Sequence, residues 1–400
     1  MLESDQYLLV TGLLFLISII SGKIFTRFGT PLLLVFIGIG MLAGEDGPGG
    51  IQFSDFNGAY LIGSIALAVI LFDGGLATPK TMVRQALAPA FAMATLGVVV
   101  CCGLVGAVVV LLFHVTWPEA LLLGAVIAPT DAAAVTVLLR MSGVSVPTRV
   151  FAVLEVESGF NDPMSVFLTV TLVEILLHPG NLDVLHTLLG LGQEMGGGVL
   201  LGVAGGYALL GLLRWLKLDA TLSPVLALGG ALAVFGGAQV AHTSGFLAVY
   251  IAGLVLGNND YQTQMPVKGF FSAFVWLAQI TLFLMLGLLV TPHDLIAFVG
   301  PALIVAAMLI FVARPIAAAL CLLPLGFSAA ETGFIAWVGL RGAVPIYLTL
   351  IPVLSGEKSS STLFCVVVVI VIASVAIQGW TIGPVARLLR LKADPGDTAH

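Results

Sequence analysis

Long apolar stretches, separated by charged residues, glycine and proline, make up most of this sequence. Of its 400 residues, 59% are hydrophobic and 9% are charged, whereas a soluble domain has about 25% charged residues. An α-helix needs about 20 mostly apolar residues to cross a bilayer. We therefore predict an all-α polytopic membrane protein with 13 transmembrane helices. Their ranges are 6–28, 31–44, 58–76, 85–113, 118–139, 148–177, 188–213, 221–242, 245–257, 266–290, 295–322, 327–352 and 361–388.

The charges in the loops between these helices predict an orientation. Loops on the cytoplasmic side of a membrane are rich in Lys and Arg. With the N-terminus outside, 12 of the 15 Lys and Arg residues fall in internal loops or at the C-terminal end. We therefore expect the N-terminus outside, the C-terminus in the cytoplasm and a short cytoplasmic tail at 391–400.

A weak internal repeat relates the two halves of the chain. The segment "PLLLVFIGIGMLAGED" (31–46) aligns without gaps to "GFLAVYIAGLVLGNND" (245–260), with five identities in 16 positions. The offset between the two segments spans seven predicted helices. Because seven is an odd number, the second segment crosses the membrane in the opposite direction to the first. The same offset brings Pro129 close to Pro345, so helices 5 and 12 are both predicted to be interrupted. An inverted repeat with paired broken helices is typical of secondary transporters, which bind their substrate near the midplane.

Polar residues within the apolar stretches are the candidates for function, because a carboxylate at a helix centre costs several kcal/mol. The carboxylates that lie away from predicted helix ends are Asp73, Asp131, Glu155, Glu157 and Asp162.

The stretch "VESGFNDPMS" (156–165) holds the densest group. Ser158 and Asp162 are four residues apart, as are Glu157 and Asn161, so one side of a helix presents all four. Hard oxygen ligands of this kind suit an alkali cation.

Two further stretches supply backbone groups and a counter-charge. In "AVIAPTDAAAV" (125–135), Pro129 disfavours helix at the preceding residue, so Thr130 and Asp131 lie at a break. In "WVGLRGAVPIY" (337–347), glycines and a proline loosen a helix that carries Arg341. A buried guanidinium needs an anionic partner, and we predict Glu157 for this role.

The motifs "LFDGGL", "APTDAAAV", "ESGFNDP" and "GLRGAVPI", in this order, resemble the monovalent cation/proton antiporter superfamily. Within it the sequence is similar to the NhaP/NHE branch and to bacterial K⁺/H⁺ antiporters of the cell-volume-regulation type. The resemblance implies a homodimer in the cell (inner) membrane, with an NhaA-like inverted repeat and helices 5 and 12 unwound where they cross. It implies an antiporter domain at 1–390. The dimerisation part would be helices 1–3 and 7–10 (about 1–80 and 188–290), and the core part helices 4–6 and 11–13 (about 85–177 and 295–388).

The resemblance also assigns roles to residues. Asp162 would bind the cation or the proton, with Asn161 as its companion. Thr130, Asp131 and Ser158 would complete the ion shell, so that K⁺ or Na⁺ contacts Asp162, Ser158 and Thr130. Asp73 stands where many relatives have Glu near the cytoplasmic ion path, and Glu157 with Arg341 matches a structural ion pair. The Asn-Asp pair implies electroneutral exchange of one cation for one proton.

Two other classes of protein remain as alternatives. A cation channel fits the broken helices, but no filter-like run of the TVGYG kind is present. An intramembrane aspartyl protease would use two membrane aspartates, but no Gly-x-Gly-Asp signature is present. The expected partners are monovalent cations, protons, membrane lipid and a second copy of the chain. No cofactor, nucleic-acid partner or enzymatic activity is expected.

Overall fold

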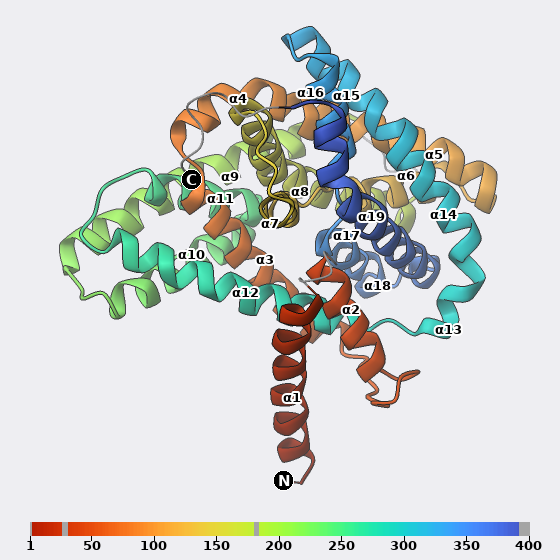
Figure 1. The fold of residues 1–400 in the computed structure, drawn as a ribbon, viewed down its shortest axis with the longest axis horizontal. Helices are drawn as coiled ribbons and strands as arrows, with labels where there is room; N and C mark the ends of the chain where they lie inside the picture. Colours follow the sequence, from red (N-terminus) through yellow and green to blue (C-terminus); the bar gives the residue numbers. More distant parts are fainter. Residues whose placement is uncertain (1, 26–30, 180–183, 392–400) are drawn as a thin grey trace.

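The computed structural model describes residues 2–25, 31–179 and 184–391, and their regular structure is helical (Figure 1). Among these residues the sole β feature is an isolated bridge between Gly44 and Ile51. The predicted all-α class is therefore confirmed. Most of the predicted tail, as well as the end of the first predicted helix at 26–28, lies outside the described residues.

Nine helical segments within the described ranges are long and apolar enough to cross a membrane. Seven correspond to α1 (Leu2–Phe25), α3 (Phe56–Ala77), α8 (Thr148–Leu177), α9 (Val184–Leu216), α10 (Leu222–Val240), α12 (Gln264–Leu288) and α19 (Ser360–Leu388). The shorter apolar helices are α2 (Leu32–Ala43), α6 (Trp117–Val126), α7 (Ala132–Ser142), α11 (Gly245–Gly257), α17 (Ala343–Leu348) and α18 (Leu350–Leu354). How these shorter helices cross a membrane decides the total, so the count of 13 stays a prediction.

The other two long segments each contain a π-helical turn. The first runs through α4 (Lys80–Ala92), the π turn η2 (Met93–Gly97) and α5 (Val98–Phe113). The second runs through α13 (Pro292–Leu295), η3 (Ile296–Phe298), α14 (Val299–Met308), the π turn η4 (Leu309–Ala313), α15 (Arg314–Leu322) and η5 (Leu323–Leu325). A π turn leaves a backbone carbonyl without its usual partner and is frequent at functional sites. The Cys321 thiol donates to the carbonyl of Ala92, just before the first π turn, at 3.4 Å.

Two helices stop in the interior, as predicted. The helical path stops after α6 at Val126 and resumes at Ala132, and it stops after α16 (Ala329–Trp337) and resumes at Ala343. Pro129 explains the first break. Asp131 is the N-cap residue of α7. Its Oδ1 accepts a hydrogen bond from the Ala134 N–H at 2.9 Å, which satisfies one of the free backbone donors at the start of the helix. At the second break the glycines lie in the non-helical stretch, whereas Pro345 lies inside α17.

The helices α3 and α11 pack closely against each other through glycine. A Cβ atom on Gly253 of α11 would lie 2.3 Å from the carbonyl oxygen of Phe72 in α3, and one on Gly75 of α3 would lie 2.2 Å from that of Tyr250. These glycines therefore allow α3 and α11 to touch backbone to backbone. The contact fixes the position of Tyr250, which reaches the site described below.

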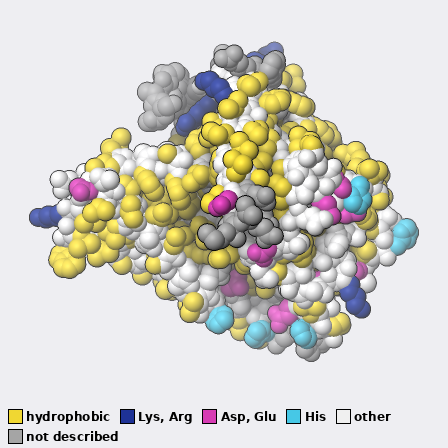
Figure 2. Space-filling model, turned by 90° about the horizontal axis from the view of Figure 1, so that it is seen from below, with side chains coloured by type: hydrophobic (Ala, Val, Ile, Leu, Met, Phe, Trp, Pro, Cys, Tyr) yellow, Lys and Arg dark blue, Asp and Glu magenta, His cyan; other side chains and the backbone are white. Residues whose placement is uncertain are grey.

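Hydrophobic side chains cover much of the surface. Figure 1 shows α1 projecting from the rest of the chain, and Figure 2 shows a broad hydrophobic area with several histidine and acidic side chains along one edge. Large exposed apolar residues such as Leu8, Leu111 and Val240 belong to this surface. Such an extensive apolar surface is that of a protein that lies in lipid.

An exposed ion pair ties the loop after α2 to the start of α13. His293 Nδ1 lies 2.6 Å from Asp46 Oδ2, and the His293 backbone N–H donates to the same oxygen at 2.8 Å. That backbone hydrogen bond holds the pKa of Asp46 below its ordinary value. The contact fixes one end of the segment 292–325, which carries Arg314 of the site.

Candidate ion-binding site

The helix α8 presents its polar residues in two directions. It is continuous through Pro163, and Glu157, Asn161 and Asp162 are all buried. Glu157 and Asn161 contact side chains of neighbouring elements, whereas Ser158 and Asp162 line a cavity. The predicted cluster therefore divides into a packing face and a cavity face.

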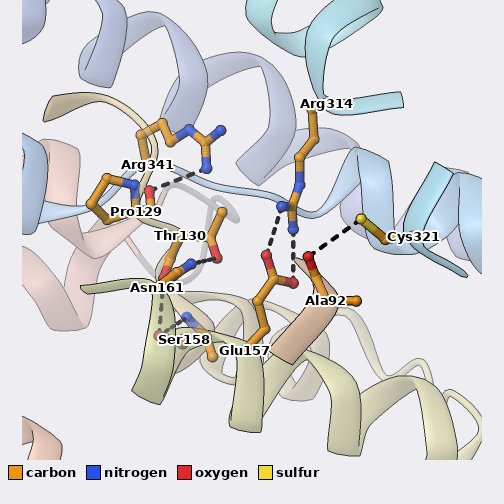
Figure 3. Close-up of polar contacts among 10 residues, drawn as sticks. Ala92, Pro129, Thr130, Glu157, Ser158, Asn161, Arg314, Cys321 and Arg341 are labelled. Atoms are coloured by element: carbon orange, nitrogen blue, oxygen red, sulfur yellow. Dashed lines mark hydrogen bonds and ion pairs between the residues drawn. The ribbon is translucent and has the colours of Figure 1, made fainter. Parts of the chain in front are cut away.

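The first helix break is held against α8 at Thr130. The Ser158 hydroxyl donates to the Thr130 carbonyl at 2.9 Å, and the Asn161 amide donates to the Thr130 hydroxyl at 2.7 Å (Figure 3). A break in a buried helix leaves backbone carbonyls without partners, and each one costs free energy unless a donor reaches it. Ser158 and Asn161 therefore bind the unwound chain in addition to their predicted role beside the ion.

The two helix breaks bind each other. The Asp131 backbone N–H donates to the Leu340 carbonyl at 2.9 Å, and Arg341 Nη1 donates to the Pro129 carbonyl at 3.1 Å. A Cβ atom on Gly342 would lie 2.1 Å from Asp131 Oδ2, so glycine is required there by the close approach. These contacts place Thr130 and Asp131 next to the second break.

Two polar residues of α19 anchor the second break, and the sequence analysis missed both. The Ser374 hydroxyl accepts the Arg341 backbone N–H at 3.1 Å, and the Gln378 amide donates to the Trp337 carbonyl at 2.6 Å. Both side chains are buried in an otherwise apolar helix. The available signal was the presence of polar residues within an apolar stretch, which is the rule that selected the carboxylates.

The predicted partner of Glu157 was wrong. Arg314, at the start of α15, donates from Nη1 and Nη2 to the two carboxylate oxygens of Glu157 at 2.6 and 2.9 Å. Both residues are buried, so the geometry is a bidentate ion pair in the interior. Arg341 instead turns to the Pro129 carbonyl, because that break offers acceptors that no helix satisfies (Figure 3).

A cavity of about 70 Å³ lies beside Asp162. Its polar lining comes from Thr130, Asp131, Glu155, Ser158, Asp162, Tyr250 and Gln279. Asp162 Oδ1 is buried without a hydrogen-bond partner among the described residues. A carboxylate that lines a cavity together with hydroxyl-bearing side chains fits a hard monovalent cation. Asp73 does not line this cavity, although its neighbour Gly74 does.

The described residues contain no group of three or more His, Cys, Asp and Glu that would hold a tightly bound metal ion. The four cysteines are buried and free. The polar chemistry of the cavity is therefore that of oxygen ligands.

A family model described as "Sodium/hydrogen exchanger, transmembrane" matches residues 12–388. The chain belongs to this family. It is 46% identical over 385 residues to the K(+)/H(+) antiporter NhaP of Alkalimonas amylolytica, which covers 96% of this chain and 67% of the relative. It is 42% identical over 393 residues to the K(+)/H(+) antiporter NhaP2 of Shewanella oneidensis, covering 98% of this chain and 68% of the relative.

The fold agrees with a solved structure. The sodium proton antiporter MjNhaP1 of Methanocaldococcus jannaschii superposes with a TM-score of 0.83 at 23% identity, covering 97% of this chain and 99% of that chain. The sodium/hydrogen exchanger family consists of multi-pass membrane transporters, and the chain is one of them, not an enzyme. The protease interpretation is therefore excluded.

We predict that the buried ion pair of Glu157 and Arg314 stabilises the fold of this exchanger. Glu157→Ala and Arg314→Ala should each lower the free energy of unfolding by about 3–5 kcal/mol, because each leaves a charge stranded in the interior. The double variant Glu157→Ala/Arg314→Ala should lose clearly less than the sum of the two single losses. Thermal melting in detergent measures all three losses.

Arg341→Ala supplies the matched control for this cycle. Its loss should nearly add to that of Glu157→Ala, since the two side chains form no salt bridge. Additivity between Glu157 and Arg314, together with strong coupling between Glu157 and Arg341, would contradict the assignment.

Proposed function

We propose that the chain exchanges a monovalent cation, K⁺ or Na⁺, for H⁺ by alternating access, with the cation and the proton competing for Asp162. One observation carries this proposal: Asp162 lines a cavity beside the two helix breaks, and its buried Oδ1 has no hydrogen-bond partner among the described residues. An ionised carboxylate in such a place is costly unless a positive charge neutralises it. Either a bound cation or a proton meets that need, and the two exclude each other. When neither is bound, the charged Asp162 is costly to move through the membrane barrier. The site therefore changes sides with a cation or a proton bound, and this couples the two fluxes.

The ligands that we assign to the cation are Asp162, Ser158 and Thr130. Ser158 and Thr130 are already joined by a hydrogen bond, and both line the cavity. Asp131 uses one carboxylate oxygen to begin α7, so we assign it an electrostatic role beside the ion. Asn161 fixes the Thr130 hydroxyl and so orients this shell. Asp73 is assigned to the path by which the cation reaches the cavity, since the next residue, Gly74, lines the cavity.

The membrane arrangement that we propose keeps 13 crossings, with the N-terminus outside and the C-terminus in the cytoplasm. The fifth crossing is α6 with α7, and the twelfth is α16 to α18, each unwound at the midplane. The π turns η2 and η4 support an inverted repeat, since they begin 216 residues apart (309 minus 93), close to the offset of 214 between 31–46 and 245–260. The proposed core part is 85–177 with 295–388, and the dimerisation part is 1–80 with 188–290.

The relatives at 46% and 42% identity are named K(+)/H(+) antiporters, and this supports K⁺ as the first cation to test. We further propose a homodimer in the inner membrane, working in pH homeostasis and cell volume regulation. A channel would instead give a sustained conductance in a bilayer recording, and this measurement distinguishes the two classes.

The proposal predicts that Asp162→Asn abolishes exchange and leaves the fold intact. The amide can neither titrate nor neutralise a cation. Proton flux into proteoliposomes is followed with a pH-sensitive dye, with K⁺ and Na⁺ gradients applied in turn. Glu174→Gln, at an exposed position of the same helix, is the matched control and should exchange at the wild-type rate. Cation-driven proton flux near the wild-type rate in Asp162→Asn would remove Asp162 from the central role.

The proposed exchange of one cation for one proton moves no net charge, so membrane voltage should leave it unaffected. The potential is clamped at several values with an ionophore for an ion that is not transported. The cation and proton gradients at which net flux vanishes should stay the same at every voltage. A balance point that shifts with voltage would mean that the stoichiometry is not one to one.

A further inference from the structure

The cavity beside Asp162 contains a second carboxylate to which no role is assigned. Glu155, Ser158, Gly159 and Asp162 all line it, and their spacings of three, four and seven residues place them on one face of α8. Glu155 and Asp162 are two helical turns apart, which is about 10 Å along the axis. Two carboxylates of α8 therefore line the cavity at different depths along the helix, in addition to Asp131.

Glu155 has few partners for a carboxylate in this position. Its Oε1 lies 2.9 Å from the Thr136 hydroxyl, which also lies 2.9 Å from the Ala132 carbonyl. One hydroxyl hydrogen cannot serve both acceptors at once, so this contact satisfies Glu155 only in part. No salt bridge to Glu155 exists in the part of the chain that the structure describes. An ionised Glu155 therefore has Arg140 as a counter-charge within electrostatic range but no directly paired cation.

Tyr250 of α11 supplies a neutral oxygen to the same cavity. Its side chain is buried, and the Thr78 side chain is a polar neighbour of its hydroxyl. Its ring lies against Gly159, where a Cβ atom would come within 2.6 Å of the ring atoms Cε1 and Cζ. Gly159 stands between Glu155 and Asp162 along the helix face. The ring therefore divides the lining of the cavity between the two carboxylates.

Thr136 connects this end of the cavity to a larger one. It lines a second cavity of about 420 Å³, together with Arg140, Ser145 and Thr148 around the turn between α7 and α8. The contact between Thr136 and Glu155 therefore lies between the two cavities, and Glu155 is a carboxylate of the small cavity at the end nearest the larger one.

We propose that Glu155 and the Tyr250 hydroxyl form a second subsite for the transported monovalent cation, separate from the one at Asp162. This inference rests on the proposed exchange function. The ligand class is the same, a hard alkali cation held by carboxylate and hydroxyl oxygens. The cation occupies this subsite first and passes the Tyr250 ring to reach Asp162. Gly159 provides the space in which the ring sits.

Cation binding without transport tests the subsite directly. Thermal melting of Asp162→Asn is measured in KCl or NaCl and in choline chloride at equal ionic strength. A ligand that binds only the folded state raises the melting temperature. Asp162→Asn should keep a melting-temperature increase that depends on K⁺ or Na⁺, Asp162→Asn/Glu155→Gln should lose it, and the control Asp162→Asn/Glu174→Gln should keep it. The absence of a cation-dependent shift in Asp162→Asn, or its persistence in the Glu155 double variant, would overturn the proposal.

Transport kinetics with Asp162 intact separate this role from a structural one. Glu155→Gln should raise the KM for the cation about tenfold, a loss of ~1.4 kcal/mol of binding free energy, with the maximal rate nearly unchanged. Glu155→Asp should restore most of the affinity, and Tyr250→Phe should raise KM about threefold, the effect of one hydrogen-bonding group. A lower maximal rate and lower stability with an unchanged KM would assign Glu155 a structural role and overturn the subsite. The exchange function itself fails separately, if Asp162→Asn still transports.

Discussion

The site depends on a backbone hydrogen bond between two places where helices stop. The Asp131 N–H and the Leu340 carbonyl meet in the interior, 2.9 Å apart. Interrupting a helix in a membrane is tolerated only where other groups satisfy the freed backbone. Here the two breaks satisfy each other, and Arg341 and Ser158 complete the set. The first break is what places the Thr130 residue, with its hydroxyl, in the lining of the cavity.

The helix α8 serves this arrangement from two sides. On its packing face, Glu157 holds Arg314 and so joins α8 to α15 in the second half of the chain. On its cavity face, Asp162 keeps one oxygen without a hydrogen-bond partner in the part of the chain that the structure describes. The paired carboxylate and the unpaired one lie five residues apart in one helix. The first stabilises the fold, and the second is left for the cation or the proton.

Much of the fold followed from the sequence, since Pro129 and the glycines around Arg341 mark the breaks and the apolar stretches mark the helices. The choice of partner for Glu157 did not follow, because the sequence holds two arginines in apolar stretches and their spacing along the chain does not say which faces α8. Arg341 is drawn to the Pro129 carbonyl, a contact that exists only once both breaks have formed. Tyr250 and Gln279 were missed for a similar reason: each reaches the cavity from a separate helix, and the sequence does not say which face of that helix meets α8.

The central claim is that the transported cation binds where the two breaks meet α8. Thallous ion replaces K⁺ and scatters X-rays anomalously, so a structure determined with Tl⁺ reports the position of the cation directly. The account predicts an anomalous peak in contact with Asp162, Ser158 and Thr130. Peaks of bound Tl⁺ elsewhere in the membrane-embedded part of the chain, with none touching Asp162, would contradict it.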